Sequence, residues 1–134
     1  MIYIGNFLFV TNQQSSNEAD RRHGEFNLVV DAGDEPTAIT KFKERIAAFR
    51  TSSSFFEGEC SVYFTKMLQF GEFPKDHAKM INYKSFAGDP IMPFIECTLP
   101  SAESNACTIL EWDRNTPELD GKKNKVFVEF KIDS

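Results

Sequence analysis

Histidine is scarce in this chain of 134 residues, and several motifs that would identify an enzyme are absent. The two histidines are His23 and His77, so a zinc site built on three histidines is excluded. The chain has no Cys-x-x-Cys pair, no Gly-x-Ser-x-Gly elbow, no phosphate-binding loop and no Gly-x-Gly-x-x-Gly turn. We therefore expect no cofactor and no metal site, and we assign no catalytic residue.

An excess of basic residues and a long apolar run are also lacking. The formal net charge is −5 and the pI is near 5.0. This charge disfavours nucleic acid and anionic membranes as partners, because both attract clustered Lys and Arg. The opening stretch MIYIGNFLFV is apolar but has no basic flank and contains Asn6. It is predicted to be a strand rather than a signal peptide or a membrane span.

Cysteine is limited to three residues, Cys60, Cys97 and Cys107. An odd number leaves one thiol over in any disulfide scheme, so reduced thiols in a cytoplasmic protein are the simpler interpretation. Each thiol can act in catalysis only if a histidine approaches it in space. A buried structural cysteine is the commoner case.

The composition is otherwise that of one ordinary domain. Hydrophobic residues make up 41% and charged residues 26% of the chain, and no linker or repeat divides it. We expect a single domain over residues 1–134. Phenylalanine occurs 14 times, and most of these rings are predicted to lie in the core.

Two periodicities predict the first half of the fold. Residues 2–11 are apolar on both alternating faces, which is typical of a strand in the middle of a sheet or in a covered one. A polar loop follows, and residues 25–33 alternate as the return arm of a hairpin. Ile39, Phe42, Ile46 and Phe49 then form one stripe on an amphipathic helix over residues 36–50.

Further strands are predicted in the rest of the chain, at residues 60–70, 80–86, 93–99, 107–113 and 125–133. The order is strand, strand, helix and then about four strands. The fold class is therefore α+β, with a mostly antiparallel sheet of about five to six strands and the one helix packed on it.

The run DAGDEP, Asp31 to Pro36, places three carboxylates close together just before the helix. Its spacing does not match a calcium-binding loop. Capping explains most of it, because Asp34 can accept hydrogen bonds from free N–H groups and Glu35 complements the positive helix end. Pro36 suits the first turn. This capping interpretation does not account for Asp31.

The segment Asp20–Glu25 is the most site-like part of the sequence. Arg21, Arg22 and His23 are placed at the end of a polar loop, where they can bind phosphate or carboxylate. The alternative is a set of solvated charges, because acids flank them on both sides. Whether Asp31 faces this loop cannot be derived from the sequence.

Three aromatic residues are candidate contacts for a partner. Phe55 and Phe56 are adjacent in a predicted loop, where an exposed ring can mark a partner surface. The favoured alternative is that both fold back over the helix end. Trp112 lies in a predicted strand and is of the residue type most often found at interface hot spots.

These features predict a non-enzymatic binding or protein-interaction domain, with a protein or small ligand as its partner. The alternative is a small cofactor-independent or metal-dependent enzyme that uses the Arg21–His23 loop and nearby acids. A third hypothesis, RNA or DNA binding, is disfavoured by the net charge and by basic residues divided between two flanks of the helix. The exposed edge of an antiparallel sheet also offers a route to a homodimer.

Overall fold

The computed structural model describes residues 1–88 and 128–132. Its regular elements are β1 (Ile2–Thr11), the 3-10 helix η1 (Glu18–Asp20), β2 (Arg22–Asp31), α1 (Glu35–Ser52) and β3 (Cys60–Phe70). All of them belong to one compact unit, Met1–Tyr83, and Lys84–Ser134 forms a second unit. The described part therefore has the predicted α+β character, with an antiparallel sheet and one helix.

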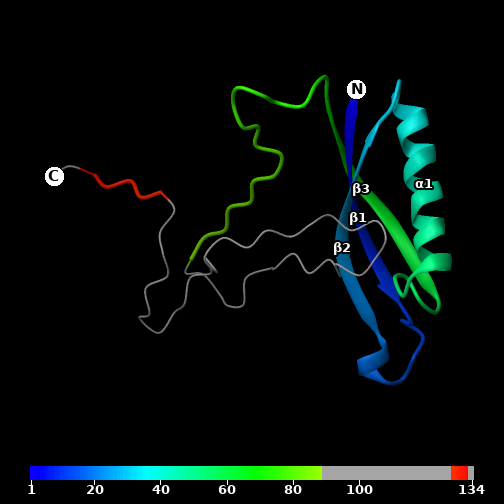
Figure 1. Cartoon of the computed structure of the whole chain (residues 1–134). Coiled ribbons are helices and arrows are strands. Elements are labelled where there is room, and N and C mark those ends of the chain that lie inside the picture. The colour runs from blue at the N-terminus through cyan, green and yellow to red at the C-terminus, as the bar shows by residue number, and fades with distance from the viewer. Residues whose placement is uncertain (89–127, 133–134) are drawn as a thin grey trace. The chain divides into compact units, whose positions relative to one another are not determined.

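The sheet has three strands in the order β2-β1-β3, and both pairings are antiparallel. The helix α1 covers one face of this sheet (Figure 1). Among the three described strands β1 is the central one, which is the position that its two apolar faces predict. The helix was predicted over residues 36–50 and extends slightly beyond both bounds.

The core lies between α1 and the sheet and is mainly aromatic. Tyr3 and Phe7 project from β1 toward α1, where Phe42 is 2% exposed. The ring of Phe7 lies 5.0 Å from that of Phe26 on β2, 4.9 Å from that of Phe64 on β3 and 5.6 Å from that of Phe42. One side chain thus connects all three strands to the helix.

Asn12, just after β1, forms hydrogen bonds with the connection between α1 and β3. The backbone N–H of Asn12 donates to the Glu59 carbonyl at 2.8 Å, and the Glu59 N–H donates to Asn12 Oδ1 at 3.2 Å. Gly58 has a φ of +75°, and a Cβ at this position would collide with the Asn12 side chain. The turn therefore needs glycine at this position for both conformation and space.

Two predictions about the strands are wrong. β2 begins at Arg22, so Arg22 and His23 belong to the strand and not to the preceding loop. Residues 80–86 form no strand, and Met80 and Phe86 are 74% and 85% exposed. The apolar residues of this segment do not alternate strictly, so no single face is available for burial in a sheet.

The other predicted strands are not tested by the structure. Residues 93–99 and 107–113 lie outside the described residues, as does most of 125–133. Residues 128–132 are described and have no strand assignment. Three strands are thus observed where about five to six were predicted. The described helices include none long and apolar enough to cross a membrane.

Replacing Phe42 by alanine tests the aromatic core. We expect Phe42→Ala to lower the free energy of unfolding by about 3–5 kcal/mol, because it removes a buried ring and leaves a cavity. Urea unfolding of the full chain measures this change. Glu44→Gln on the exposed side of the same helix is the control and should change it by less than about 0.5 kcal/mol. Equal midpoints for the two variants would contradict this account of the core.

A glycine pair tests the turn before β3. Gly58→Ala should cost about 1–3 kcal/mol, because it places a side chain at positive φ and against Asn12. The control is Gly33→Ala, since a Cβ at Gly33 meets no atom within 4 Å and no positive φ is involved. Thermal unfolding of both variants measures the difference. If Gly33→Ala were the more destabilising of the two, the proposed role of Asn12 would be wrong.

Candidate functional site

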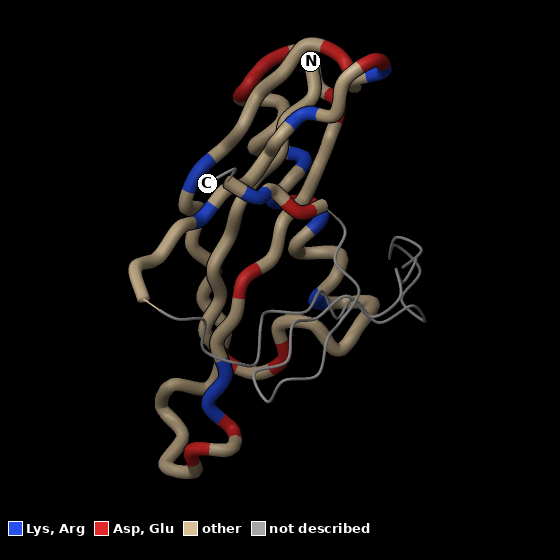
Figure 2. Tube along the Cα trace, turned by 90° about the vertical axis from the view of Figure 1, so that its left-hand side faces the viewer, with Lys and Arg blue, Asp and Glu red and all other residues tan. Residues whose placement is uncertain are grey.

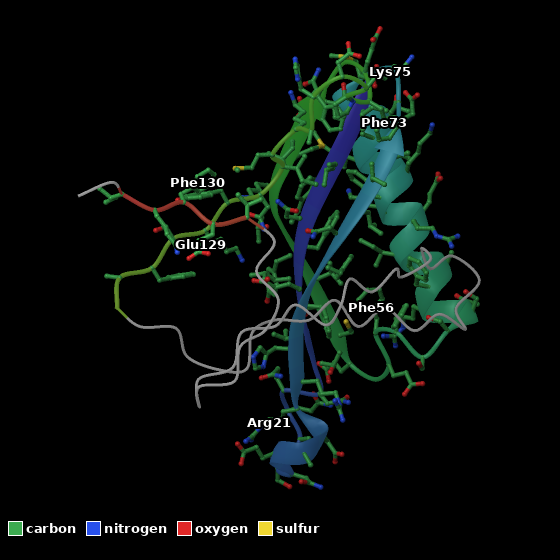
Figure 3. The ribbon with its side chains drawn as sticks, turned by 60° about the vertical axis from the view of Figure 1, so that its left-hand side comes forward. Arg21, Phe56, Phe73, Lys75, Glu129 and Phe130 are labelled. Carbon is green, nitrogen blue, oxygen red and sulfur yellow. The ribbon has the colours of Figure 1, made fainter. Side chains whose placement is uncertain are left out.

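The Arg21–His23 group is not assembled into a site in the described structure. Arg21 follows η1, and its Nη1 donates to the Ser15 carbonyl at 3.3 Å. Arg22 and His23 are successive residues of β2, so their side chains point to opposite faces of the sheet. Figure 3 shows Arg21 at the tip of the β1–β2 connection, far from Phe73 and Lys75 at the other end of the sheet.

Asp31 lies at the opposite end of β2 from His23. The strand rises about 3.3 Å per residue, which separates the two residues by roughly 26 Å. The Asp31 side chain is 76% exposed, and its Oδ1 lies 3.4 Å from the terminal amine of Met1. The question left by the sequence is thereby answered: Asp31 does not face the arginine loop.

The rest of DAGDEP caps the helix, as predicted. Asp34 is the N-cap residue of α1, and its Oδ1 accepts a hydrogen bond of 2.9 Å from the Thr37 N–H. A hydrogen bond from the Thr37 side chain, together with this backbone hydrogen bond, stabilises the ionised carboxylate and lowers the pKa of Asp34. Among the described residues, no three His, Cys, Asp or Glu side chains are grouped so that they could hold a metal ion.

Charge is mixed over the described chain. Acidic and basic positions are interspersed along the trace in Figure 2, and the β1–β2 connection carries both signs. A nucleic-acid backbone instead attracts clustered Lys and Arg.

The two loop phenylalanines pack inward, which confirms the prediction that they fold back. Phe56 is 9% exposed, and its ring lies 5.0 Å from that of Phe26 and 5.5 Å from that of Phe9. Phe55 is half-buried, with its ring 5.5 Å from that of Phe49 near the end of α1. Trp112 lies outside the described residues. A partner contact through Phe55 or Trp112 therefore stays a prediction.

Among the described residues, an apolar groove lies between α1 and β3. Its volume is about 300 Å³, and it exists because α1 packs mainly over β1 and β2 and covers the helix-facing side of β3 only in part. Phe64 on this side of β3 is 43% exposed. The lining is apolar except for one lysine and consists of Phe7, Ile39, Phe42, Lys43, Ile46, Ala47, Val62 and Phe64.

The outer edge of β3 borders this groove. β3 pairs with β1 on one side and with no described strand on the other. Within residues 1–88 and 128–132, its outer backbone N–H and C=O groups therefore pair with no other strand, which is the arrangement to which a strand can be added. A register shift falls between Asn6 and Phe7, where the Thr65 hydroxyl donates to the Asn6 carbonyl at 2.8 Å.

Cys60 is placed at the start of β3, near the end of α1. Burial raises the pKa of this thiol, and the positive charge of Arg50 partly offsets the effect. The Arg50 Nη1 donates to the Phe56 carbonyl at 2.6 Å. A raised pKa leaves the thiol protonated at neutral pH, which is unfavourable for nucleophilic catalysis.

Sequence reasoning missed the groove, although it identified some of its lining. Ile39, Phe42 and Ile46 were predicted as one buried stripe of the helix. The adjacent aromatic residues Tyr63 and Phe64 could have indicated an exposed apolar surface on β3. Adjacent residues of a strand point to opposite faces, so both cannot lie in one core. Tyr63 and Phe64 are 55% and 43% exposed in the structure.

Comparison with known proteins finds no relative: no family model, no curated protein and no solved structure matches this chain. Function therefore has to be inferred from the geometry of the groove and of the β3 edge.

Asp34 gives a pH-dependent test of the capping assignment. The variant Asp34→Asn keeps a capping oxygen but loses the charge that complements the helix N-terminus. We expect the wild type to be the more stable protein at neutral pH. Because the folded-state pKa lies below the ordinary value of 3.8, this advantage is present above that value and is lost as the pH falls through the lowered pKa.

Thermal unfolding of both proteins between neutral pH and about pH 2.5 measures the difference. A difference that stayed constant down to the lowest pH would show that the Asp34 charge does not stabilise the helix.

Proposed function

We propose that Met1–Tyr83 is a non-enzymatic binding domain that recognises an extended segment of a protein partner. The segment adds as a strand to the outer edge of β3, and its side chains enter the groove between β3 and α1. The observation that supports this proposal most directly is that the outer edge of β3, which has no partner strand among the described residues, lies beside an apolar groove.

Strand geometry supports this mode of binding. An added strand would lie about 4.8 Å from β3, and every second side chain would point to the helix side of the sheet. These side chains meet the apolar lining that Val62 and Phe64 present from β3. Backbone hydrogen bonds then supply affinity, and the groove supplies selectivity.

A small ligand and an enzyme are less well supported. Small-ligand sites usually hold several converging polar groups. Lys43 is the one charged residue that lines this groove. The enzyme alternative needs the arginine loop close to an acid such as Asp31, and β2 separates them by its whole length.

The proposed location is the cytoplasm. Support comes from the odd number of cysteines, which suits a compartment that keeps thiols reduced. Cys60, the cysteine within the described residues, is a free thiol.

Two neighbouring alanines of α1 provide a matched test. Both Ala47 and Ala48 are exposed, but Ala47 lines the groove and Ala48 does not. The probe is a random linear peptide library displayed on phage and selected against the full chain. We expect enriched peptides with alternating apolar residues, which should bind Ala47→Gln about tenfold more weakly than wild type and Ala48→Gln about equally.

Hydrogen exchange locates the bound peptide, and protection of the β3 amides is the expected result. Absence of enriched peptides, or equal effects of the two alanine variants, would overturn the proposal. Light scattering of the full chain examines a homodimer through the same edge. A dimer that Ala47→Gln dissociates and Ala48→Gln does not would replace the proposed partner with a second copy.

A further inference from the structure

Lys43 is placed where it can determine the charge of the bound segment. It contributes the one charged side chain of the groove lining. The apolar stem of a lysine can lie along such a lining while its ammonium group stays at the rim. A partner segment in the groove would therefore meet a positive charge at a defined point.

The other basic side chains of α1 are already engaged. Lys41 Nζ donates to the Asp31 carbonyl at 3.2 Å, and Arg50 Nη1 donates to the Phe56 carbonyl. The guanidinium of Arg45 lies 4.5 Å from the centre of the Phe49 ring. Each of these three cations thus stabilises the domain itself.

Lys43 has no such role in the part of the chain that the structure describes. Within residues 1–88 and 128–132 it makes neither a hydrogen bond nor an ion pair. Its neighbours one helical turn away are Ile39, Thr40, Ile46 and Ala47, none of which is acidic. The helix therefore provides no carboxylate of its own for this ammonium group.

The chain has 20 acidic residues and a net charge of −5. A lysine that borders an apolar groove and has no acidic partner among the described residues contrasts with this acidic character. An ion pair that forms beside an apolar surface is less screened than one surrounded by water on all sides. A carboxylate on a segment that covers the groove would therefore be attracted to the Lys43 ammonium group.

We infer that the β3 groove selects an extended segment with alternating apolar side chains and a carboxylate that pairs with the Lys43 ammonium group. This inference rests on the proposed function and adds the chemistry of the partner. The carboxylate belongs to an Asp or Glu side chain on the groove side of the segment, and a C-terminal carboxylate is an outcome that the test distinguishes.

The test uses peptides enriched from libraries displayed with either a free or a blocked C-terminus. Each peptide is compared with its Asp→Asn or Glu→Gln form and with its C-terminal amide, by fluorescence anisotropy against the full chain. We expect loss of the carboxylate to weaken binding about five- to tenfold at about 50 mM NaCl, and less at about 500 mM. Binding that is weakened only by the C-terminal amide would show that the carboxylate is not on a side chain and would overturn that part of the inference.

Lys43→Met is the decisive variant, because it keeps an unbranched stem and removes the charge. Against this variant, peptides with and without the carboxylate should bind equally. Lys41→Met is the matched control and should keep the preference, since Lys41 is engaged with Asp31. In a selection against Lys43→Glu, acidic peptides should give way to basic ones.

Two failures are distinguishable. If peptides bind at β3 but the loss of the carboxylate costs the same in wild type and in Lys43→Met, the charge selection is wrong and strand addition stands. If no peptide is enriched against wild type, both the charge selection and the proposed function are overturned.

Discussion

The packing of Phe7 is the interaction on which the described structure depends. Its ring contacts Phe26, Phe42 and Phe64, which come from β2, α1 and β3. Without a large ring at this point, the helix and the two outer strands would have no common contact. Gly5 makes this arrangement possible on the same face of β1, because a Cβ there would come within 2.7 Å of the Phe7 ring. Only part of the high phenylalanine content serves this core, since Phe73, Phe86 and Phe130 are exposed.

The position of α1 over this core produces the candidate site. A single helix cannot cover three twisted strands completely, and α1 lies over β1 and β2. The helix side of β3 is therefore left with a groove, while the outer edge of the same strand is left without a described neighbour. The groove arises because α1 packs closer to β2 than to β3, and the edge lies on the same side of the sheet. Their proximity is the basis on which we propose that this surface binds an extended segment.

The first half of the fold was predictable because its signals are local. The period of the apolar residues changes from two to 3.6 at the end of β2. Asp34 caps the helix by accepting a hydrogen bond from the nearby Thr37 N–H. The candidate site was not predictable in the same way. Arg22 and His23 were expected in a loop, but pairing with Thr11 and Val10 extends β2 to include them. Whether such a residue belongs to a strand is decided by the residue with which it pairs and not by its own sequence neighbours.

The sequence by itself determined the hairpin, the capped helix, the third strand and the aromatic character of the core. These follow from periodicity and capping, which act over a few neighbouring residues. The tertiary structure decided that Asp31 and His23 lie at opposite ends of a strand, that Phe56 is buried and that Lys43 borders a groove. Each of these facts depends on which elements pack together and which side of β3 the helix leaves open. Such contacts join residues distant in sequence, and no local pattern encodes them.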